Sequence, residues 1–390
     1  MRLKMSEKAP PSKLTAPLLD WKARKIEDPV ARLRFLRTAT TAMEAGSSST
    51  RMFRRSGFWA IALVLAASAA MPFRTLLSAS HTDRAPRITP AVAKVDVTKI
   101  WQVEATKEFE NYSNGLRIEK QYAVANRPRP QYRVFERNGP RADKYTTRSN
   151  ISGIVFHTTE SHIAAFKKEA NETLRRAGRS VLAEVQIRRC YNYLIDRFGR
   201  VWRIVQESDV AWHAGQSIWA DATGVYVNLN ESFLGVSFEA ETYGKDGQAI
   251  ATEAQIYSAR LLTDMLRAKY NIPASNCATH AQVSVSMASM GVAYHTDWAG
   301  NFPFAAMGLP NNYAEPLPSL WTFGFNYDQS FIRLLADKPW TGLILAEQHV
   351  REQAALAGIP AAQYKLRLQQ RYKDLILALY GANEEQANES

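Results

Sequence analysis

From residue 151 to residue 270 the chain alternates short apolar runs with stretches of helical periodicity, and this alternation constrains the fold more than any other feature. Short apolar runs between turn signals are typical of buried strands, whereas apolar residues recurring every three or four positions indicate amphipathic helices. Strands separated by helices favour an α/β fold with a mixed central β-sheet flanked by helices. The segments are 151–161, a strand ending at His157; 161–184, helical and broken only at Gly178; 190–205, a strand, a turn and a strand; 233–242, a strand; and 252–270, an amphipathic helix.

The regions on either side of this core have a different character. Two alternating runs within residues 100–124 flank Asn114-Gly115, a pair that strongly indicates a β-hairpin. Residues 125–141 return to irregular chain. After about residue 313 the pattern changes again, and residues 327–381 are mostly helical, with breaks at Pro339, Gly342, Gly358 and Pro360. The sequence therefore predicts a helical C-terminal extension.

The charge of the chain is concentrated at its N-terminus. The formal net charge is +12. Residues 1–56 hold thirteen Lys and Arg against five Asp and Glu, so this tail carries +8 and leaves +4 for the other 334 residues. Because the bulk of the chain is nearly balanced, the charge argues against a nucleic-acid binder.

An uncharged run follows the basic tail directly. Residues 57–73 carry no charge and are bracketed by Arg55 and Arg74, which predicts a transmembrane anchor whose N-terminal side stays in the cytoplasm. A chain starting at Met52 would instead begin with a basic stretch, an apolar core and a small-residue site, as in a cleaved signal peptide. A buried core helix is the third interpretation. The first two share one expectation, which is export of everything that follows.

Three residues far apart in the chain are candidates for a metal site. His157 ends a buried strand, His280 lies in a loop after the long helix, and Asp297 follows His280 by seventeen residues. Catalytic zinc usually takes three protein ligands, mixing His with a carboxylate, and keeps a fourth position for water. Taken alone, each His is more often a hydrogen-bonded core or surface residue. The two cysteines, Cys190 and Cys277, are expected to be small buried residues, although a disulfide and a metal pair formed by Cys277 and His280 both stay open.

Five blocks in the expected order resemble the type 2 N-acetylmuramoyl-L-alanine amidases, a zinc amidase family that includes the peptidoglycan recognition proteins. The resemblance covers roughly residues 148–310. The blocks are "GIVFHTTES", similar to the first ligand strand; "YNYLIDRFGRVWRIV", to the strand-turn-strand; "AWHAGQSIW", to the Trp-His loop; "NESFLGVSFEAET", to the Asn, Ser and Ile-Gly-Ile/Val strand; and "THAQVS" with "HTDWAGNFPF", to the ligand loop.

The resemblance implies a role for particular residues. His157, His280 and Asp297 match the zinc ligands. Tyr191 matches a tyrosine beside the zinc-bound water, and His295 falls where relatives place a Lys or Thr that steadies the developing oxyanion. The remaining matches are implied substrate-binding residues, namely Trp212, His213 and Asn230.

The sequence departs from the family pattern in the ligand loop. "DWAG" replaces Asp-Pro-Gly, so the loop has one extra residue and no proline to stiffen it, and His295 becomes a possible fourth ligand. Ser237 stands where one branch of the family has a catalytic Glu, and that branch lacks the tyrosine. Ser237 together with Tyr191 therefore fits the other branch. Glu239 is a weaker candidate for the base, because it lies two residues further on the same strand face.

Together these features predict a zinc-dependent amidase that cleaves the amide between N-acetylmuramic acid and L-alanine of peptidoglycan. The alternative is a recognition protein that binds peptidoglycan without cutting it. We expect a monomer on the periplasmic side of a bacterial inner membrane, with peptidoglycan or a muropeptide as substrate and no nucleic-acid partner.

The C-terminal aromatic residues are expected to pack the helices against the amidase domain, although a wall-binding module is the alternative. The predicted organisation is a basic cytoplasmic tail at 1–56, or a start misassigned before Met52; a transmembrane anchor or signal peptide at 57–77; a linker and β-hairpin region at 78–147; a zinc amidase domain at 148–312; and a helical extension at 313–390.

Overall fold

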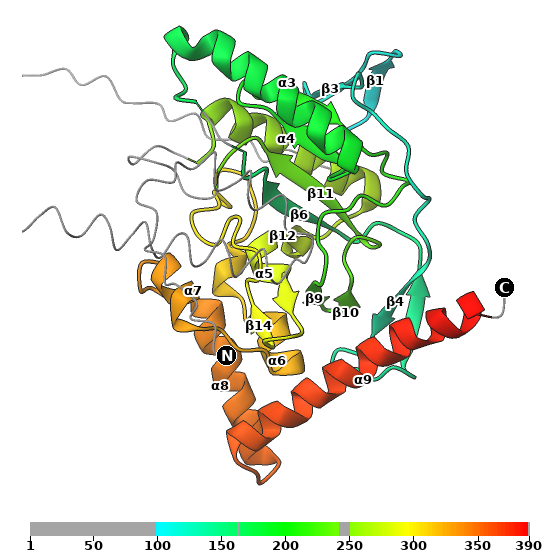
Figure 1. Ribbon diagram of the computed structural model, residues 1–390, viewed down its shortest axis with the longest axis vertical. Coiled ribbons are helices and arrows are strands. Elements are labelled where there is room, and N and C mark those ends of the chain that lie inside the picture. Colours follow the sequence, from blue (N-terminus) through cyan, green and yellow to red (C-terminus); the bar gives the residue numbers. More distant parts are fainter. Residues whose placement is uncertain (1–98, 162–163, 242–249, 389–390) are drawn as a thin grey trace, which may run out of the picture. The chain divides into compact units, whose positions relative to one another are not determined.

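The computed structural model describes residues 99–161, 164–241 and 250–388 (Figure 1). The predicted basic tail, the apolar segment at 57–77 and the linker at 78–96 lie outside the described residues. Among the residues that are described, no helix combines the length and the apolar character needed to cross a membrane.

The core of the molecule is an eight-stranded mixed sheet. Four neighbouring strands at one end of the sheet, β7, β11, β6 and β12, run parallel, and β8 joins β7 antiparallel. The predicted α/β fold with a mixed central sheet is confirmed. In sheet order the strands are β1 (Gln102–Ala105), β2 (Phe109–Tyr112), β3 (Arg117–Glu119), β8 (Val201–Arg203), β7 (Tyr193–Ile195), β11 (Phe233–Phe238), β6 (Gly153–Thr158) and β12 (Cys277–Thr279).

The two longest strands, β6 and β11, lie side by side between β7 and β12. Every residue of β6 and of β11 is buried. A strand covered on both faces needs apolar residues on both faces, and both segments are nearly continuous apolar runs. In the parallel register Ser237 lies opposite His157 near the carboxyl ends of the two strands. The register therefore delivers His157 to the edge of the sheet where strands end and loops begin.

Two long helices cover opposite faces of the sheet. Helix α4 (Glu253–Tyr270) packs Leu262 and Leu266 in one cluster with Phe156 and Val236. Its N-terminus carries a capping box between Thr252 and Gln255, and its predicted extent is confirmed. Helix α3 (Asn171–Arg188) packs against the other face of the strands, in a cluster that contains Leu182, Val185 and Leu194.

Helix α3 differs from the sequence prediction. It begins at Asn171 rather than at residue 161, and it runs through Gly178 without a break. A side chain at Gly178 would place its Cβ 3.2 Å from Oε2 of Glu239. The glycine therefore makes room for a buried carboxyl group under the helix and does not interrupt it.

The predicted hairpin at Asn114-Gly115 is confirmed, with β2 and β3 pairing antiparallel and Gly115 at a φ of 86°. The hairpin is part of the central sheet because β3 pairs with β8. A buried ion pair holds it there, since Arg203 donates to both carboxylate oxygens of Glu110 at 2.6 and 2.9 Å.

Residues 125–141 are not wholly irregular, contrary to the sequence prediction. They contain β4 (Tyr132–Phe135), the second strand of a four-stranded sheet with the order β5, β4, β10, β9. The strand is short and lies between prolines, and one of its partners comes about ninety residues later, so no local pattern reveals it. The other strands are β5 (Tyr145–Arg148), β9 (Ile218–Asp221) and β10 (Gly224–Val227), and a separate hairpin contains β13 (Val285–Ser286) and β14 (Gly291–Val292).

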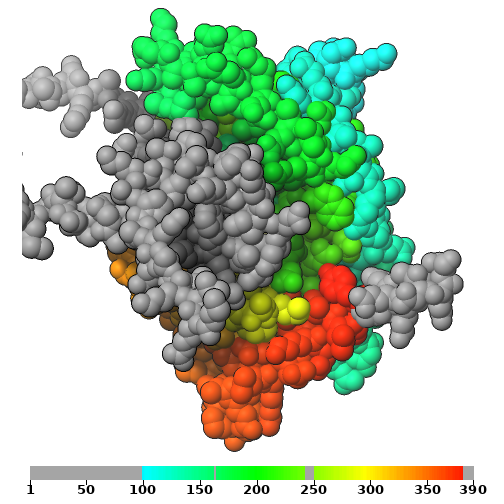
Figure 2. Space-filling view, viewed as in Figure 1, coloured from blue at the N-terminus to red at the C-terminus, as the bar shows by residue number. Residues whose placement is uncertain are grey.

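The C-terminal extension, orange to red in Figure 2, is helical, as predicted, and packs against the α/β domain. Trp340 donates its indole N–H to the carbonyl of Ala299 at 2.7 Å. Gly342 lies inside α8 and not at a break. Its lack of a side chain allows close packing, because a Cβ there would lie 2.0 Å from the Glu315 carbonyl oxygen. The helices are α6 (Pro318–Phe323), α7 (Gln329–Leu334), α8 (Thr341–Leu356) and α9 (Ala361–Asn388), and the remaining short helices are α5 (His280–Val283), η2 (Lys168–Ala170), η4 (Ala274–Asn276) and η5 (Asn312–Ala314).

Candidate metal centre

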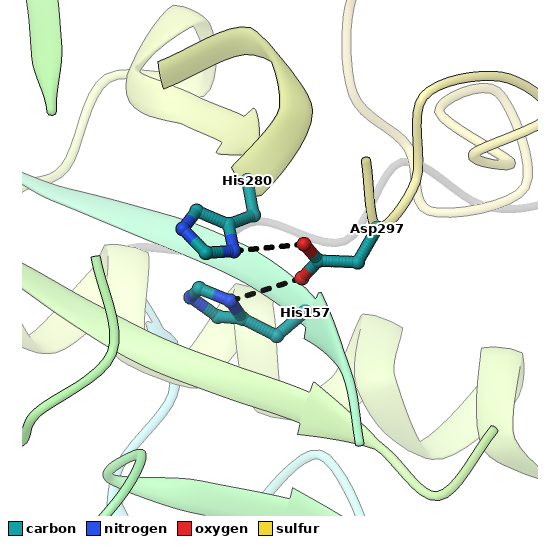
Figure 3. Close-up of side chains that lie close together, drawn as sticks. All are labelled: His157, His280 and Asp297. Carbon is teal, nitrogen blue, oxygen red and sulfur yellow. Dashed lines mark hydrogen bonds and ion pairs between the residues drawn. The ribbon is translucent and has the colours of Figure 1, made fainter. Parts of the chain in front are cut away.

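Three separate elements bring His157, His280 and Asp297 together (Figure 3). His157 lies near the end of β6. His280 is the first residue of α5, immediately after β12, and β12 pairs in parallel with β6. Asp297 arrives on the loop after β14, where its carbonyl accepts the backbone N–H of Ala281 at 3.2 Å. The three positions predicted from the sequence therefore form one cluster.

The cluster is compact and buried. Nδ1 of His280 lies 2.8 Å from Oδ1 of Asp297, and Nδ1 of His157 lies 3.2 Å from Oδ2 of the same carboxylate. Potential ligand atoms of all three residues lie within 4.8 Å of one another, and each residue is less than a tenth exposed. Two tetrahedral ligands at about 2.05 Å from a zinc ion are about 3.3 Å apart, so these separations fit one ion with small adjustments.

The electrostatics of the cluster favour the protonation states that a metal ion needs. Burial, together with the nearby His280, lowers the pKa of His157 to about 4. Burial by itself would raise the pKa of Asp297, but the adjacent His280 and His157 hold it far below its usual range. Near neutral pH the site therefore offers a neutral imidazole at His157 and an ionised carboxylate at Asp297, which is the state in which such groups bind metals.

His213 lies directly behind His157. Nε2 of His157 is 3.1 Å from Nδ1 of His213, and Nε2 of His213 is 3.3 Å from the carbonyl oxygen of Phe233. A carbonyl only accepts, so Nε2 of His213 carries the proton and Nδ1 accepts one from Nε2 of His157. This order leaves Nδ1 of His157, the atom facing Asp297, free of a proton and able to bind a cation.

The loop that carries His213 is anchored by Asn230. The Asn230 side-chain oxygen accepts the backbone N–H groups of His213 and Ala214 at 2.9 and 2.8 Å. On the other side, a Cβ on Gly235 would lie 2.6 Å from the His213 ring, so only glycine leaves room for it. His213 and Asn230 are buried. Trp212 is 45% exposed, and the Arg127 guanidinium lies over its ring, 5.3 Å from the centroid. Of the three substrate-binding candidates, only Trp212 presents its side chain to solvent.

Tyr191 and His295 lie on either side of the ligand candidates. The Tyr191 ring is 5.0 Å from that of His157, and its hydroxyl donates to the Thr158 carbonyl at 3.5 Å. Burial raises the pKa of Tyr191, so this hydroxyl stays protonated. Burial, together with His280, lowers the pKa of His295.

The orientation of the His295 ring does not suit a fourth metal ligand. Its ring stacks on that of His280 at 4.6 Å with only 15° between the planes. An imidazole binds a metal in the plane of its ring, and one ion cannot lie in the planes of two stacked, nearly parallel rings. The arrangement favours His295 beside the ion over His295 as a ligand.

Glu239 and Cys277 take no part in the cluster. The Glu239 carboxylate accepts the backbone N–H of Arg197 at 3.1 Å and faces Gly178. Burial raises the pKa of Glu239 to about 7. Cys277 is buried in the apolar core, and both cysteines are free. In the described residues the metal-binding group consists of His157, His280 and Asp297.

Trp298 is a supporting residue that sequence reasoning missed. It is 1% exposed, and its indole N–H donates to the carbonyl of His157 at 3.0 Å. Its ring also packs edge-on against Phe238 and Phe302. The sequence predicted a less rigid loop around Asp297, because it lacks the proline of the family pattern. Trp298 holds this loop in place instead. The available signal was a tryptophan directly after the candidate ligand Asp297.

Fold and site together define a mixed α/β domain with a buried His, His, Asp site of the type that binds a divalent metal ion. Residues 147–299 match the family model described as N-acetylmuramoyl-L-alanine amidase. The N-acetylmuramoyl-L-alanine amidase AmiD of Escherichia coli (strain K12) is 33% identical over 89 residues, which are 22% of this chain and 31% of that protein. The chain thus spans about a third of the curated relative that it matches.

Solved structures give weaker likenesses. A complex of E. coli AmiD with anhydro-N-acetylmuramic acid-L-Ala-D-gamma-Glu-L-Lys is 22% identical, with a TM-score of 0.31 over 53% of this chain and 68% of the other. Pseudomonas aeruginosa AmpDh3 in complex with anhydromuramic pentapeptide is 17% identical, with a TM-score of 0.32 over 59% and 82%. Residues 147–299 of the chain are therefore similar to the N-acetylmuramoyl-L-alanine amidase family.

Proposed function

We propose that the protein is a zinc-dependent amidase that hydrolyses the amide between N-acetylmuramic acid and L-alanine in the peptidoglycan stem. The observation that carries the proposal is the buried cluster of His157, His280 and Asp297, with its ligand atoms within 4.8 Å of one another. The match of residues 147–299 to the amidase family model supports this bond type, and AmiD, 33% identical over 89 residues, carries that activity in its name.

Each residue of the site has a chemical task in this proposal. His157, His280 and Asp297 would hold the zinc ion, which when bound polarises a carbonyl and lowers the pKa of a coordinated water to about 7. The protonated hydroxyl of Tyr191 orients the attacking water from the His157 side. A neutral His295 donates a hydrogen bond to the carbonyl oxygen as negative charge develops on it from the His280 side. His213 fixes the tautomer of His157.

The experiment is zinc analysis and sacculus digestion by three proteins: wild type, Asp297→Ala and Asp143→Ala. Asp143 is the matched control, because its side chain is exposed on the surface in an ion pair with Arg141. We expect about one zinc per chain and release of stem peptide for wild type and Asp143→Ala, and loss of both for Asp297→Ala. Wild type that binds zinc and sacculi but releases no peptide would be a recognition protein and would contradict the proposal.

We further propose that the domain acts outside the cytoplasm, since that is where its substrate lies, and that residues 57–77 anchor it or direct its export. The support is the sequence alone, because those residues lie outside the described ones. The test is cell fractionation with and without residues 57–73, together with protease access from the periplasmic side. Catalytic domain that remains in the cytoplasm with the full sequence would contradict this.

A further inference from the structure

Two pockets adjoin the candidate metal centre at the two ends of a chain of ring contacts. The chain runs from Tyr191 through His157, His280 and His295 to Tyr294, with successive ring centroids 5.0, 4.4, 4.6 and 4.9 Å apart. Tyr191 lines one pocket, of about 470 Å³, and Tyr294 lines the other, of about 310 Å³. A ligand whose cleaved bond lies at the metal centre can therefore extend to either side.

The pocket at Tyr191, here the charged pocket, is lined by residues of α3 and of the loop after β6. Its charged side chains are Glu160, Glu184 and Arg188. Glu184 and Arg188 form an ion pair at 2.6 Å in which both side chains are more than half exposed. Charged groups of both signs that remain accessible to water suit a ligand that carries both signs itself, as a peptide does.

The pocket at Tyr294, here the neutral pocket, has a different lining. It presents hydroxyl, amide and aromatic groups, including those of Ser286, Ser289, Tyr294 and Asn326, and its lining contains no Lys, Arg or His. The single carboxylate there, Asp328, is already engaged, because it accepts from the Ser330 hydroxyl at 2.6 Å and from the Phe331 N–H at 2.8 Å. These groups suit a ligand that is uncharged and rich in hydroxyl and amide groups.

The neutral pocket has walls from two parts of the chain. Thr296, which precedes the ligand Asp297, contributes from within the matched amidase segment, whereas Asn326 belongs to the C-terminal extension. The extension is fixed to the β13–β14 hairpin, since the Asn326 N–H donates to the Met290 carbonyl at 2.7 Å and the Asn326 carbonyl accepts from Val292 at 2.8 Å. The pocket is therefore a built feature that exists only because the extension packs there.

We propose that the neutral pocket binds the glycan of the substrate, as a site for an uncharged N-acetylated sugar ring. The peptide of the bound substrate extends from the metal centre into the charged pocket. This inference rests on the proposed function. The volume is at the lower end for small-molecule sites, which suits one or two sugar rings. Tyr294 is 67% exposed and offers an aromatic face for stacking, while Asn326 is exposed and offers an amide for hydrogen bonds.

The test measures binding of two separate probes to the full-length, zinc-free protein by titration with NMR detection. One probe is di-N-acetylchitobiose, a neutral sugar without peptide, and the other is the tripeptide L-Ala-γ-D-Glu-L-Lys. The variants are Tyr294→Ala and Asn326→Ala, and the control is Tyr257→Ala, an equally exposed tyrosine on α4 outside the pocket. We expect each pocket variant to weaken sugar binding about fivefold or more and to leave tripeptide binding unchanged.

Three outcomes would overturn the inference. These are no sugar binding by wild type at about 10 mM, equal sugar affinity in wild type and Tyr294→Ala, or a loss of tripeptide affinity in Tyr294→Ala. Because the protein carries no zinc in this assay, the result does not depend on hydrolysis. Sugar binding at the pocket by a protein that never cleaves sacculi would refute the proposed function alone, and cleavage without sugar binding would refute this inference alone.

Discussion

The ring of His213 lies behind that of His157, with Nδ1 of His213 3.1 Å from Nε2 of the ligand candidate. We predict that His213→Ala weakens zinc binding about 10- to 100-fold, because His157 then loses the acceptor that fixes its tautomer and ring orientation. Competition with a chelator measures the affinity. His349→Ala is the control, since His349 is exposed on α8. Equal zinc affinity in His213→Ala and wild type would mean that His213 does not position the ligand.

Gly235 leaves the space that the His213 ring occupies, and a Cβ there would lie 2.6 Å from that ring. Gly235→Ala should destabilise the fold by about 1–3 kcal/mol, because either the ring or strand β11 must shift. It should weaken zinc binding as well. Gly300→Ala is the matched control, as a Cβ at Gly300 meets no atom within 4 Å. Urea unfolding tests this, and wild-type stability of Gly235→Ala would rule out the tight packing.

Trp298 ties the ligand loop to His157 through its indole N–H, at 3.0 Å. Trp298→Phe keeps an aromatic ring but leaves the buried His157 carbonyl without this donor. We expect a loss of about 1–3 kcal/mol in stability, together with weaker zinc binding because Asp297 is less firmly placed. Trp101→Phe serves as control because Trp101 is 63% exposed. Unchanged melting and zinc affinity in Trp298→Phe would show that the loop is held by other contacts.

Glu239 predicts a distinct pH dependence. Burial raises its pKa from 4.5 to about 7 in the folded state, and the unfolded state ionises at the lower value. The folded state therefore loses stability relative to the unfolded one as pH rises from about 4.5 to 7, by roughly 3 kcal/mol in total.

Glu239→Gln removes this titration, and its amide oxygen can still accept from the Arg197 N–H. The variant should gain stability over wild type as pH rises from 5 to 8, as measured by urea unfolding at both values. Other groups titrate in both proteins, so the difference between the two isolates Glu239. A difference that stays constant with pH would show that this carboxyl group titrates near its ordinary pKa.

Much of the parallel part of the sheet could be predicted because its two longest strands carry their own signal. Strands β6 and β11 are nearly continuous apolar runs, and α4 has both the helical period and a capping residue at Thr252. Strand β4 could not be found, because it is four residues long and its stability comes from β5 and β10. The beginning of α3 was missed because residues 161–170 mix apolar and polar side chains much as the helix itself does.

The three candidate ligands were accessible through the resemblance, whereas the supporting residues were not. His157, His280 and Asp297 stand in recognisable blocks of sequence. The burial of His213 depends on the absence of a side chain at Gly235, twenty-two residues away, and on the anchor at Asn230. The neutral pocket depends on how the C-terminal extension packs, and no local pattern encodes that contact.

The most direct test of the metal centre is a crystal structure of the zinc-loaded protein with an anomalous difference map at the zinc absorption edge. We predict a single strong peak about 2.0–2.2 Å from Nδ1 of His157, Nδ1 of His280 and a carboxylate oxygen of Asp297. The His295 ring should lie beside the ion without coordinating it. A map with no peak among these three side chains, or with a peak held by other residues, would contradict the account.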